Sequence, residues 1–321
     1  MTELLVVGPD NTTGFRKHLE ETANLFSKKK SVFHPIHTRG DEQLQELVDY
    51  QAKLTLIGGR NWIKRNTHIL NELPGKTGLL VAGPLGQNEI SGIEIENLVY
   101  FMKLLDEGKT DYIFLGCPHL TDRIDNEKVI YTPAPMVKEL KKEYTKPFPK
   151  RNIVSILNDN APHKNTLNSL AGISLSKKTD ELIVNGLPTD HLYLAEKYGL
   201  NPILNNTEKL PLTKYRSTIQ ESKLILHLSY SEGLCYGALE ALYRHTPVLV
   251  TTAMPWFDHP LLTVQNPSDH YEIANRMDTI LEMDKNKYRD LGRTCRYIAN
   301  NKILENNTVA KNNIEGILDS I

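Results

Sequence analysis

Short runs of apolar residues recur along the whole chain and alternate with longer stretches in which polar and apolar residues mix. Runs of this length, rich in Val, Ile and Leu and bounded by turn residues, are typical of buried strands. Strands that alternate with helices form a mostly parallel sheet, so the pattern predicts an α/β fold. The expected strands are 4–8, 32–35, 54–59, 79–83, 112–116, 129–135, 153–157, 181–186, 202–204, 224–226 and 248–250.

The mixed stretches between these strands predict helices, because good helix formers and apolar residues at helical spacing fill them. Segment 136–152 differs: it is rich in lysine and is interrupted by Pro147 and Pro149, which favours a connection between domains. A chain of 321 residues fits two domains, 1–147 and 148–321. The expected helices are 15–28, 41–50, 60–70, 94–106, 166–175, 190–198, 210–221, 238–243, 271–283, 287–300 and 306–320.

Composition describes an ordinary globular protein, with 40% hydrophobic and 24% charged residues and a net charge of −1. This balance gives no general attraction to nucleic acid or anionic lipid. The first residues read as a strand rather than a charged-then-apolar leader, and no apolar run is long enough for a membrane span. Three widely spaced cysteines, Cys117, Cys235 and Cys295, predict neither a disulfide framework nor a metal cluster. We therefore expect a cytoplasmic protein.

The strongest candidates for a ligand-binding site lie in residues 221–251. This stretch reads as strand, glycine-containing loop, helix and strand. Gly233 and Gly237 let the backbone of the loop approach a ligand closely. The free N–H groups at the start of the helix form an anion site. Glu232 precedes that site and Glu240 lies in the first turns of the helix. This layout suits a ligand with phosphate in its middle and hydroxyls at both ends.

The same stretch resembles the E-x7-E element of retaining GT-B-type glycosyltransferases of the group 1 type. The family's Phe-Gly pair corresponds to Cys235-Tyr236 or nearby, and its glycine before Thr-Pro corresponds to His245. The resemblance implies the GT-B fold, with two Rossmann-like doubly wound domains facing a cleft. In that fold the last helix often packs back on the N-terminal domain. The residues that match in register are Ser229, Glu232, Leu239, Glu240, Ala241, Pro247 and Val248.

The resemblance also implies roles for residues of the second domain, which would bind the nucleotide-sugar donor. Glu232 would bind hydroxyls of the donor sugar and steady developing positive charge, and Glu240 would accept from the ribose hydroxyls. Lys164 matches the family lysine that holds the diphosphate, although an exposed lysine before a helix is the alternative. The family's arginine falls near Asp159, which is unsuitable, so Arg151 or His163 are substitutes. Donor-binding backbone is expected at Gly233, Leu234, Cys235 and Tyr236.

The first domain would bind the acceptor by the same resemblance. The loop at Thr13 and Gly14 follows the first strand, where such folds bind ligands, although a plain turn is equally consistent. The family histidine near the reacting sugar is missing, and Gln87 or Glu89 stand in its place, unless this loop only caps a helix. His119 follows the strand at 112–116. It could bind an acceptor hydroxyl, or be structural.

Together these features predict a retaining, metal-independent glycosyltransferase. It would move a sugar from a UDP-linked donor to a hydroxyl of a glycan, lipid-linked or small-molecule acceptor, with no cofactor and with closure of the domains about a hinge. One alternative is transfer to hydroxymethylated bases in DNA, for which the basic residues are Arg60, Lys64, Arg65 and Lys28–Lys30. Another is a sugar-nucleotide-binding protein without catalysis, and a third is a nucleotide-sugar epimerase. The sequence leaves the acceptor and the oligomeric state open.

Overall fold

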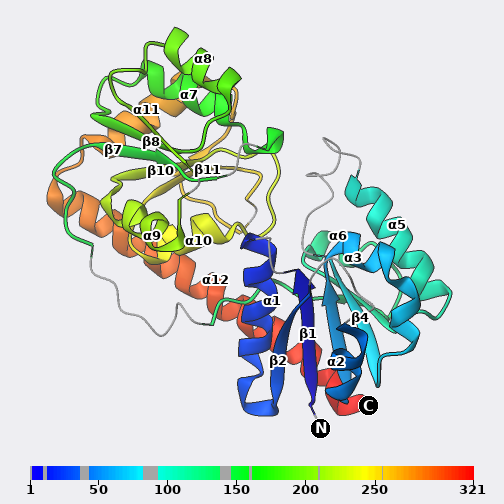
Figure 1. Ribbon diagram of the computed structural model, residues 1–321. Helices are drawn as coiled ribbons and strands as arrows, with labels where there is room; N and C mark the ends of the chain where they lie inside the picture. Colours follow the sequence, from blue (N-terminus) through cyan, green and yellow to red (C-terminus); the bar gives the residue numbers. More distant parts are fainter. Residues whose placement is uncertain are drawn as a thin grey trace. The chain divides into compact units, whose positions relative to one another are not determined.

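The computed structural model describes residues 2–9, 13–36, 43–81, 93–137, 146–158, 161–208, 210–254 and 256–321. The chain divides into two compact units (Figure 1). The first unit consists of Met1–Lys142 and Ile303–Ile321, and the second unit consists of Glu143–Lys302. Each unit contains one six-stranded sheet.

The sheet of the first unit is parallel throughout and has the strand order β2-β1-β3-β4-β5-β6. Because β1 has β2 on one side and β3 on the other, the strand order reverses between β1 and β3. The strands are β1 (Leu4–Pro9), β2 (Ser31–Ile36), β3 (Leu54–Gly58), β4 (Lys76–Val81), β5 (Tyr112–Leu115) and β6 (Val129–Tyr131). The helices are α1 (Thr13–Leu25), η1 (Ser27–Lys29), α2 (Leu44–Asp49), α3 (Arg60–Arg65), η3 (Thr67–Asn71), α5 (Ile93–Asp106) and α6 (Pro118–Thr121).

Alternate residues of β1 enter two different cores, one on each face of the sheet. Leu4 and Val6 pack with α1 and with Ile314 of α12 (Lys285–Ser320). Leu5 and Val7 pack with α2, α3, η3 and α5. All five side chains are fully buried. Each such burial contributes roughly 1.5–3 kcal/mol, which explains why this strand reads as a continuous apolar run.

The sheet of the second unit is also parallel, with the order β12-β11-β10-β7-β8-β9. Here the strand order reverses between β7 and β10. The strands are β7 (Ile153–Ile156), β8 (Glu181–Asn185), β9 (Leu204–Thr207), β10 (Leu224–His227), β11 (Val248–Thr251) and β12 (Thr263–Val264). The helices wholly within this unit are η5 (Pro162–Lys164), α7 (Thr166–Leu175), α8 (Thr189–Lys197), α9 (Leu212–Glu221), α10 (Tyr236–Tyr243) and α11 (His270–Leu281).

Helices cover both faces of this second sheet. Figure 1 shows α7, α8 and α11 on one face and α9 and α10 on the other. Helices α7 and α11 approach closely at Gly172, where a Cβ atom would lie only 2.4 Å from Cγ2 of Ile273. Two parallel sheets with helices on both faces confirm the predicted α/β class of doubly wound domains.

Lys146, the first described residue of the second unit, is anchored in that unit. Its ammonium donates to the carbonyls of Ile219 at 3.1 Å and Ser222 at 2.5 Å, and to Oγ1 of Thr246 at 2.7 Å. Three acceptors match the three donors of an ammonium group, so this lysine fixes the start of the unit.

The C-terminal segment differs from the sequence prediction. Helices expected at 287–300 and 306–320 form one helix, α12, whose residues from 303 onward belong to the first unit. The sequence prediction left residues 301–305 outside a helix, but Ala299, Ile303, Asn306 and Ala310 keep one helical face buried through this point. Helical spacing of buried positions therefore outweighed the local composition.

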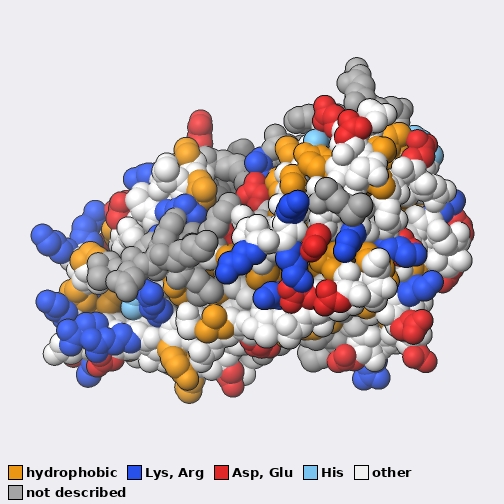
Figure 2. All heavy atoms as spheres, turned by 90° about the horizontal axis from the view of Figure 1, so that it is seen from below, with side chains coloured by type: hydrophobic (Ala, Val, Ile, Leu, Met, Phe, Trp, Pro, Cys, Tyr) orange, Lys and Arg blue, Asp and Glu red, His pale blue; other side chains and the backbone are white. Residues whose placement is uncertain are grey.

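Charges of both signs occur on the face shown in Figure 2, in keeping with the net charge of −1. None of the helices within the described ranges is both long and apolar enough to span a membrane.

Candidate functional site

The reversal of strand order in the second unit places two loops side by side. In open parallel sheets, ligands bind beyond the carboxyl ends of the strands at this reversal. The segment after β7 carries Lys164, and the segment after β10 carries Glu232. Because β7 and β10 pair directly, residues far apart in the sequence meet at this edge.

The segment after β7 is shaped by a short helix and a left-handed residue. Lys164 ends η5, and Asn165 follows with φ of 56° and ψ of 38° before α7 begins. Asparagine tolerates this conformation better than most residues. The carbonyl of His163 accepts from the N–H of Tyr230 at 2.8 Å, which ties this segment to the loop after β10. No side chain caps the start of α7, so its amides can serve an anion.

Glu232 lies at the centre of a compact polar cluster and is only 8% exposed. Its Oε1 accepts from the ammonium of Lys164, from Nε2 of His227 at 2.6 Å and from Oγ of Ser229 at 2.7 Å. His227 is the last residue of β10, so the strand itself positions this imidazole. Among the described residues, every hydrogen bond to this carboxylate is made to Oε1.

The cluster keeps Glu232 ionised. Burial acts to raise its pKa, but His227 and Lys164 outweigh burial and hold the pKa of this carboxyl well below its usual range. For His227, burial acts to lower the pKa, whereas Cys235 and Glu232 raise it to about 10. At neutral pH the site therefore holds a carboxylate between an ammonium and an imidazolium.

Cys235 forms the N-terminal boundary of α10 in a left-handed conformation, with φ of 54° and ψ of 80°. A residue with a Cβ atom costs roughly 1–2 kcal/mol in this region. Its Sγ lies 3.0 Å from Nε2 of His227, and no side chain caps the helix. The carbonyl of Leu234 accepts from the indole of Trp256 at 3.1 Å. The loop from Gly233 to Tyr236 thus presents a second helix start beside Lys164.

Glu240 is held by two arginines. Its Oε1 accepts from Nε of Arg216 at 3.0 Å and from Nη2 of Arg244 at 3.0 Å. Glu240 and Arg244 are almost fully buried, whereas the side chain of Arg216, from α9, is 29% exposed. A ligand bound at Glu240 would lie beside this network of ion pairs. Arg216 is the more exposed of the two arginines and would contact the ligand more readily.

The E-x7-E motif did not predict several of the residues that contact Glu232 and Glu240. His227 directly follows the predicted strand 224–226, Arg216 lies in the predicted helix 210–221 and Arg244 directly follows the predicted helix 238–243. None of the three was predicted as a site residue. Arg151 does not replace the missing family arginine. It precedes β7, at the amino end of the sheet, and pairs there with Glu181 at 2.8 Å.

The first unit contains the residues expected to bind the acceptor. Thr13 and Gly14 begin α1, directly beyond β1 at the reversal of strand order. His119 lies in the short helix α6 after β5. Gln87 and Glu89 lie outside the described residues. The backbone thus places Thr13, Gly14 and His119 at the carboxyl edge of the sheet, where ligands bind in such folds.

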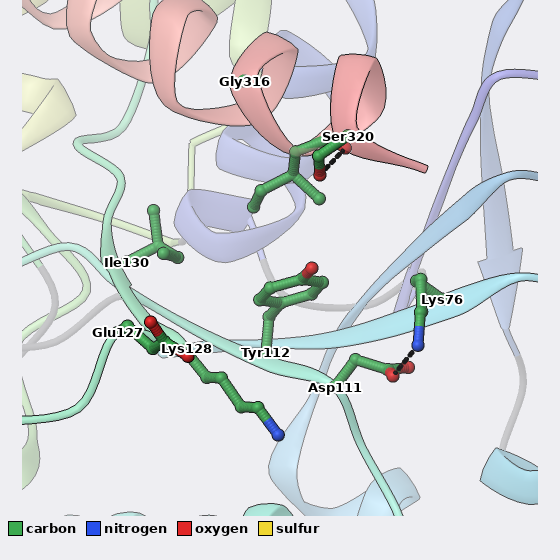
Figure 3. Close-up of a pocket in the computed structure, with 9 residues that line it drawn as sticks. Lys76, Asp111, Tyr112, Glu127, Lys128, Ile130, Gly316 and Ser320 are labelled. Carbon is green, nitrogen blue, oxygen red and sulfur yellow. Dashed lines mark hydrogen bonds and ion pairs between the residues drawn. The ribbon is translucent and has the colours of Figure 1, made fainter.

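A cavity of about 340 Å³ lies at the opposite edge of the first sheet (Figure 3). Its lining includes Lys76 and Tyr112, the first residues of β4 and β5, and Ser320 near the end of α12. Nζ of Lys76 donates to Asp111 at 2.8 Å at its margin. This cavity is at the amino ends of the strands and contains none of the candidate site residues.

No protein-family profile and no curated protein sequence matches this chain. Solved structures resemble it over the full length. Anabaena Alr3699/HepE in complex with UDP and glucose has a TM-score of 0.76, at 13% identity and 100% coverage of both chains. Sucrose-phosphate synthase from Thermosynechococcus elongatus has a TM-score of 0.73, at 12% identity and 100% coverage of both chains.

A glycosyltransferase from Rickettsia africae has a TM-score of 0.69, at 10% identity, with 99% of this chain and 98% of that chain covered. Likeness at this level of identity describes the fold. The predicted GT-B fold is confirmed.

Proposed function

We propose that this protein is a retaining, metal-independent glycosyltransferase that uses a UDP-linked sugar. The observation that carries the proposal is the meeting of Lys164 and Glu232 beside two uncapped helix starts, at the reversal of strand order in the second sheet. Support also comes from HepE, a protein of the same fold with structures in complex with UDP and UDP-glucose. Retention and metal independence rest on the likeness of residues 229–248 to the family motif.

The leaving diphosphate needs positive charge and preorganised N–H donors. Lys164 supplies an ammonium whose side chain is only 13% exposed, so its charge is poorly screened by water. The amides at the starts of α7 and α10 add partial positive charge. A diphosphate bound here would share the ammonium with Glu232.

The sugar that leaves the diphosphate develops positive charge in an oxocarbenium-like transition state. Glu232 remains ionised in its buried cluster and has its second oxygen, Oε2, available for sugar hydroxyls or this charge. Glu240 would accept from the ribose hydroxyls, with Arg216 as the neighbouring group that a bound donor contacts. The acceptor hydroxyl would be held by residues of the first unit, among them Thr13, Gly14 and His119.

A panel of nucleotide sugars in thermal unfolding tests the donor class. A ligand at 100 times its Kd stabilises the protein by about 2.7 kcal/mol, so UDP-sugars should raise the Tm clearly. ADP-, GDP- and dTDP-sugars at the same concentration serve as comparisons. Equal shifts for all of them, or none, would contradict the assignment of the UDP-linked donor.

Substitutions test the site itself. Lys164→Ala should lower donor affinity, and Glu232→Gln should lower turnover about 100-fold or more, by analogy with the loss of other charge-stabilising groups. The exposed pair Lys178–Glu282 in the same unit provides the matched controls K178A and E282Q. Donor hydrolysis without acceptor separates an enzyme from a binding protein. Unchanged donor affinity and turnover in K164A and E232Q would overturn the proposal.

A further inference from the structure

Three side chains of the Glu232 cluster offer different metal-ligand atoms. Nε2 of His227, the carboxylate of Glu232 and Sγ of Cys235 all lie within 4.8 Å of one another. They come from the end of β10, from the following loop and from the boundary of α10. The ordered strand and helix next to these residues therefore position the three side chains.

The separations are shorter than those that a tetrahedral ion requires. Ligand bonds of about 2.0–2.3 Å to Zn²⁺ put neighbouring ligand atoms roughly 3.3–3.6 Å apart. The observed distances are 2.6 Å between Nε2 and Oε1 and 3.0 Å between Nε2 and Sγ. Binding of an ion therefore requires these side chains to rotate apart by several tenths of an ångström.

The chemistry of the three groups selects the ion. Thiolate and imidazole favour Zn²⁺ over Mg²⁺ or Ca²⁺, which prefer oxygen ligands. One thiolate and one carboxylate balance the charge of a divalent ion. Cys235 is partly exposed, which gives the ion a route from solvent, whereas His227 and Glu232 are buried.

We propose that His227, Glu232 and Cys235 form a Zn²⁺-binding site, with the fourth position open to a further ligand. Binding releases the proton of Sγ and the proton of Nε2 to solvent, and the lone pairs of these atoms then coordinate the ion. Lys164 gives up its contact with Oε1 in this state. The ion is an inhibitor rather than a cofactor, because it takes the carboxylate and displaces the ammonium.

Binding is measured on the ligand-free full chain by competition for Zn²⁺ with a chromophoric chelator. The wild type should take up one equivalent. Cys235→Ser, which keeps the Cβ atom and a polar group, should weaken binding about 100-fold or more, as should His227→Gln. Cys117→Ser is the matched control, because Cys117 is also partly exposed and lies in the other unit.

Co²⁺ in place of Zn²⁺ identifies the sulfur ligand directly. The wild type and C117S should show a thiolate-to-cobalt charge-transfer band, and C235S should lack it. This readout stands even if H227Q fails to fold. Absence of specific Zn²⁺ uptake, or equal uptake by C235S and wild type, would overturn the proposal.

The inhibitory role rests on the proposed donor site and is tested separately. Zn²⁺ should weaken UDP-glucose binding in the wild type and leave it unchanged in C235S. If Zn²⁺ binds through Cys235 but has no effect on a measurable affinity for UDP-glucose, the metal site stands and inhibition is wrong. If UDP-glucose does not bind at all, the proposed donor fails while the metal site remains.

Discussion

Among single residues, Glu232 and Glu240, two buried glutamates of the second unit, are neutralised in different ways. Glu232 is balanced by Lys164 and His227, which lie on the loop and strand that carry the candidate site. Glu240 is balanced by Arg216 and Arg244. Removing one member of a buried ion pair leaves an uncompensated charge, and the resulting loss in the free energy of unfolding grows with the burial of that charge. The two arginines on Glu240 differ in exposure, which makes a direct comparison available.

Replacing Arg244 by Leu should lower the free energy of unfolding by about 3 kcal/mol, because both partners are almost fully buried. Arg216→Leu should cost about 1 kcal/mol, since this side chain is partly solvated. Urea unfolding of the two variants measures the difference. Arg293→Leu, which removes an exposed pair with Asp290, is the control and should change stability by less than about 0.5 kcal/mol. Equal losses in the free energy of unfolding for R244L and R216L would show that the burial of the arginine does not determine this loss.

His18 should make the first unit sensitive to acid. Burial lowers its pKa from 6.5 to about 4, so the folded protein holds this imidazole neutral. Between these two values the unfolded chain binds more protons, and stability falls as the pH drops from 6.5 to 4. The full contribution, about 3 kcal/mol, is present above pH 6.5. Urea midpoints measured from pH 7 to 4 should fall less steeply in His18→Leu, and parallel curves would contradict this assignment.

At the scale of the element, α10 is bounded by two left-handed residues that are not glycine. Cys235 precedes it with φ of 54°, and His245 follows it with φ of 64°. Position 245 is where the family motif carries glycine, the residue that most often ends a helix in this conformation. At both positions the chain carries a side chain that this conformation disfavours. His245 has a compensating contact, 3.2 Å from Nη1 of Arg296.

Two substitutions at His245 separate backbone strain from this contact. His245→Gly and His245→Ala both remove the imidazole, but only glycine adopts the left-handed conformation without strain. We expect H245G to be more stable than H245A by about 1 kcal/mol. Thermal or urea unfolding measures the difference. If the two variants are equally stable, residue 245 does not adopt the left-handed conformation after the helix.

At the scale of the whole molecule, the hydrophobic pattern of the sequence predicted the fold. It did not predict contacts between residues that lie far apart in the sequence. The apolar runs located β1 and β10 because strands buried on both faces are continuously hydrophobic. The pairing of Glu232 with Lys164 was not readable from spacing, since it depends on β7 lying beside β10. His227, which follows the predicted strand 224–226, was not predicted as a site residue, because its contact with Glu232 appears only in the three-dimensional structure. The continuity of α12 through Ile303 was not predicted, because only the three-dimensional structure shows which face of this helix is buried.

The path of α12 yields a prediction that involves both units. Its last part completes the core of the first unit, where Ile314 is fully buried beside Leu4 and Phe114. Ile314→Ala leaves a cavity in this core and should cost about 3 kcal/mol in urea unfolding. Leu304→Ala, ten residues earlier on the same helix and 48% exposed, is the control and should have little effect.

Nucleotide binding adds a second measurement on the same variants. The residues of the proposed donor site, Lys164, Glu232 and Glu240, all belong to Glu143–Lys302, so I314A should retain the Kd for UDP while losing stability. If it loses UDP binding while still folded, the proposed donor site depends on the first unit. If I314A is no less stable than L304A, the end of α12 does not support this core.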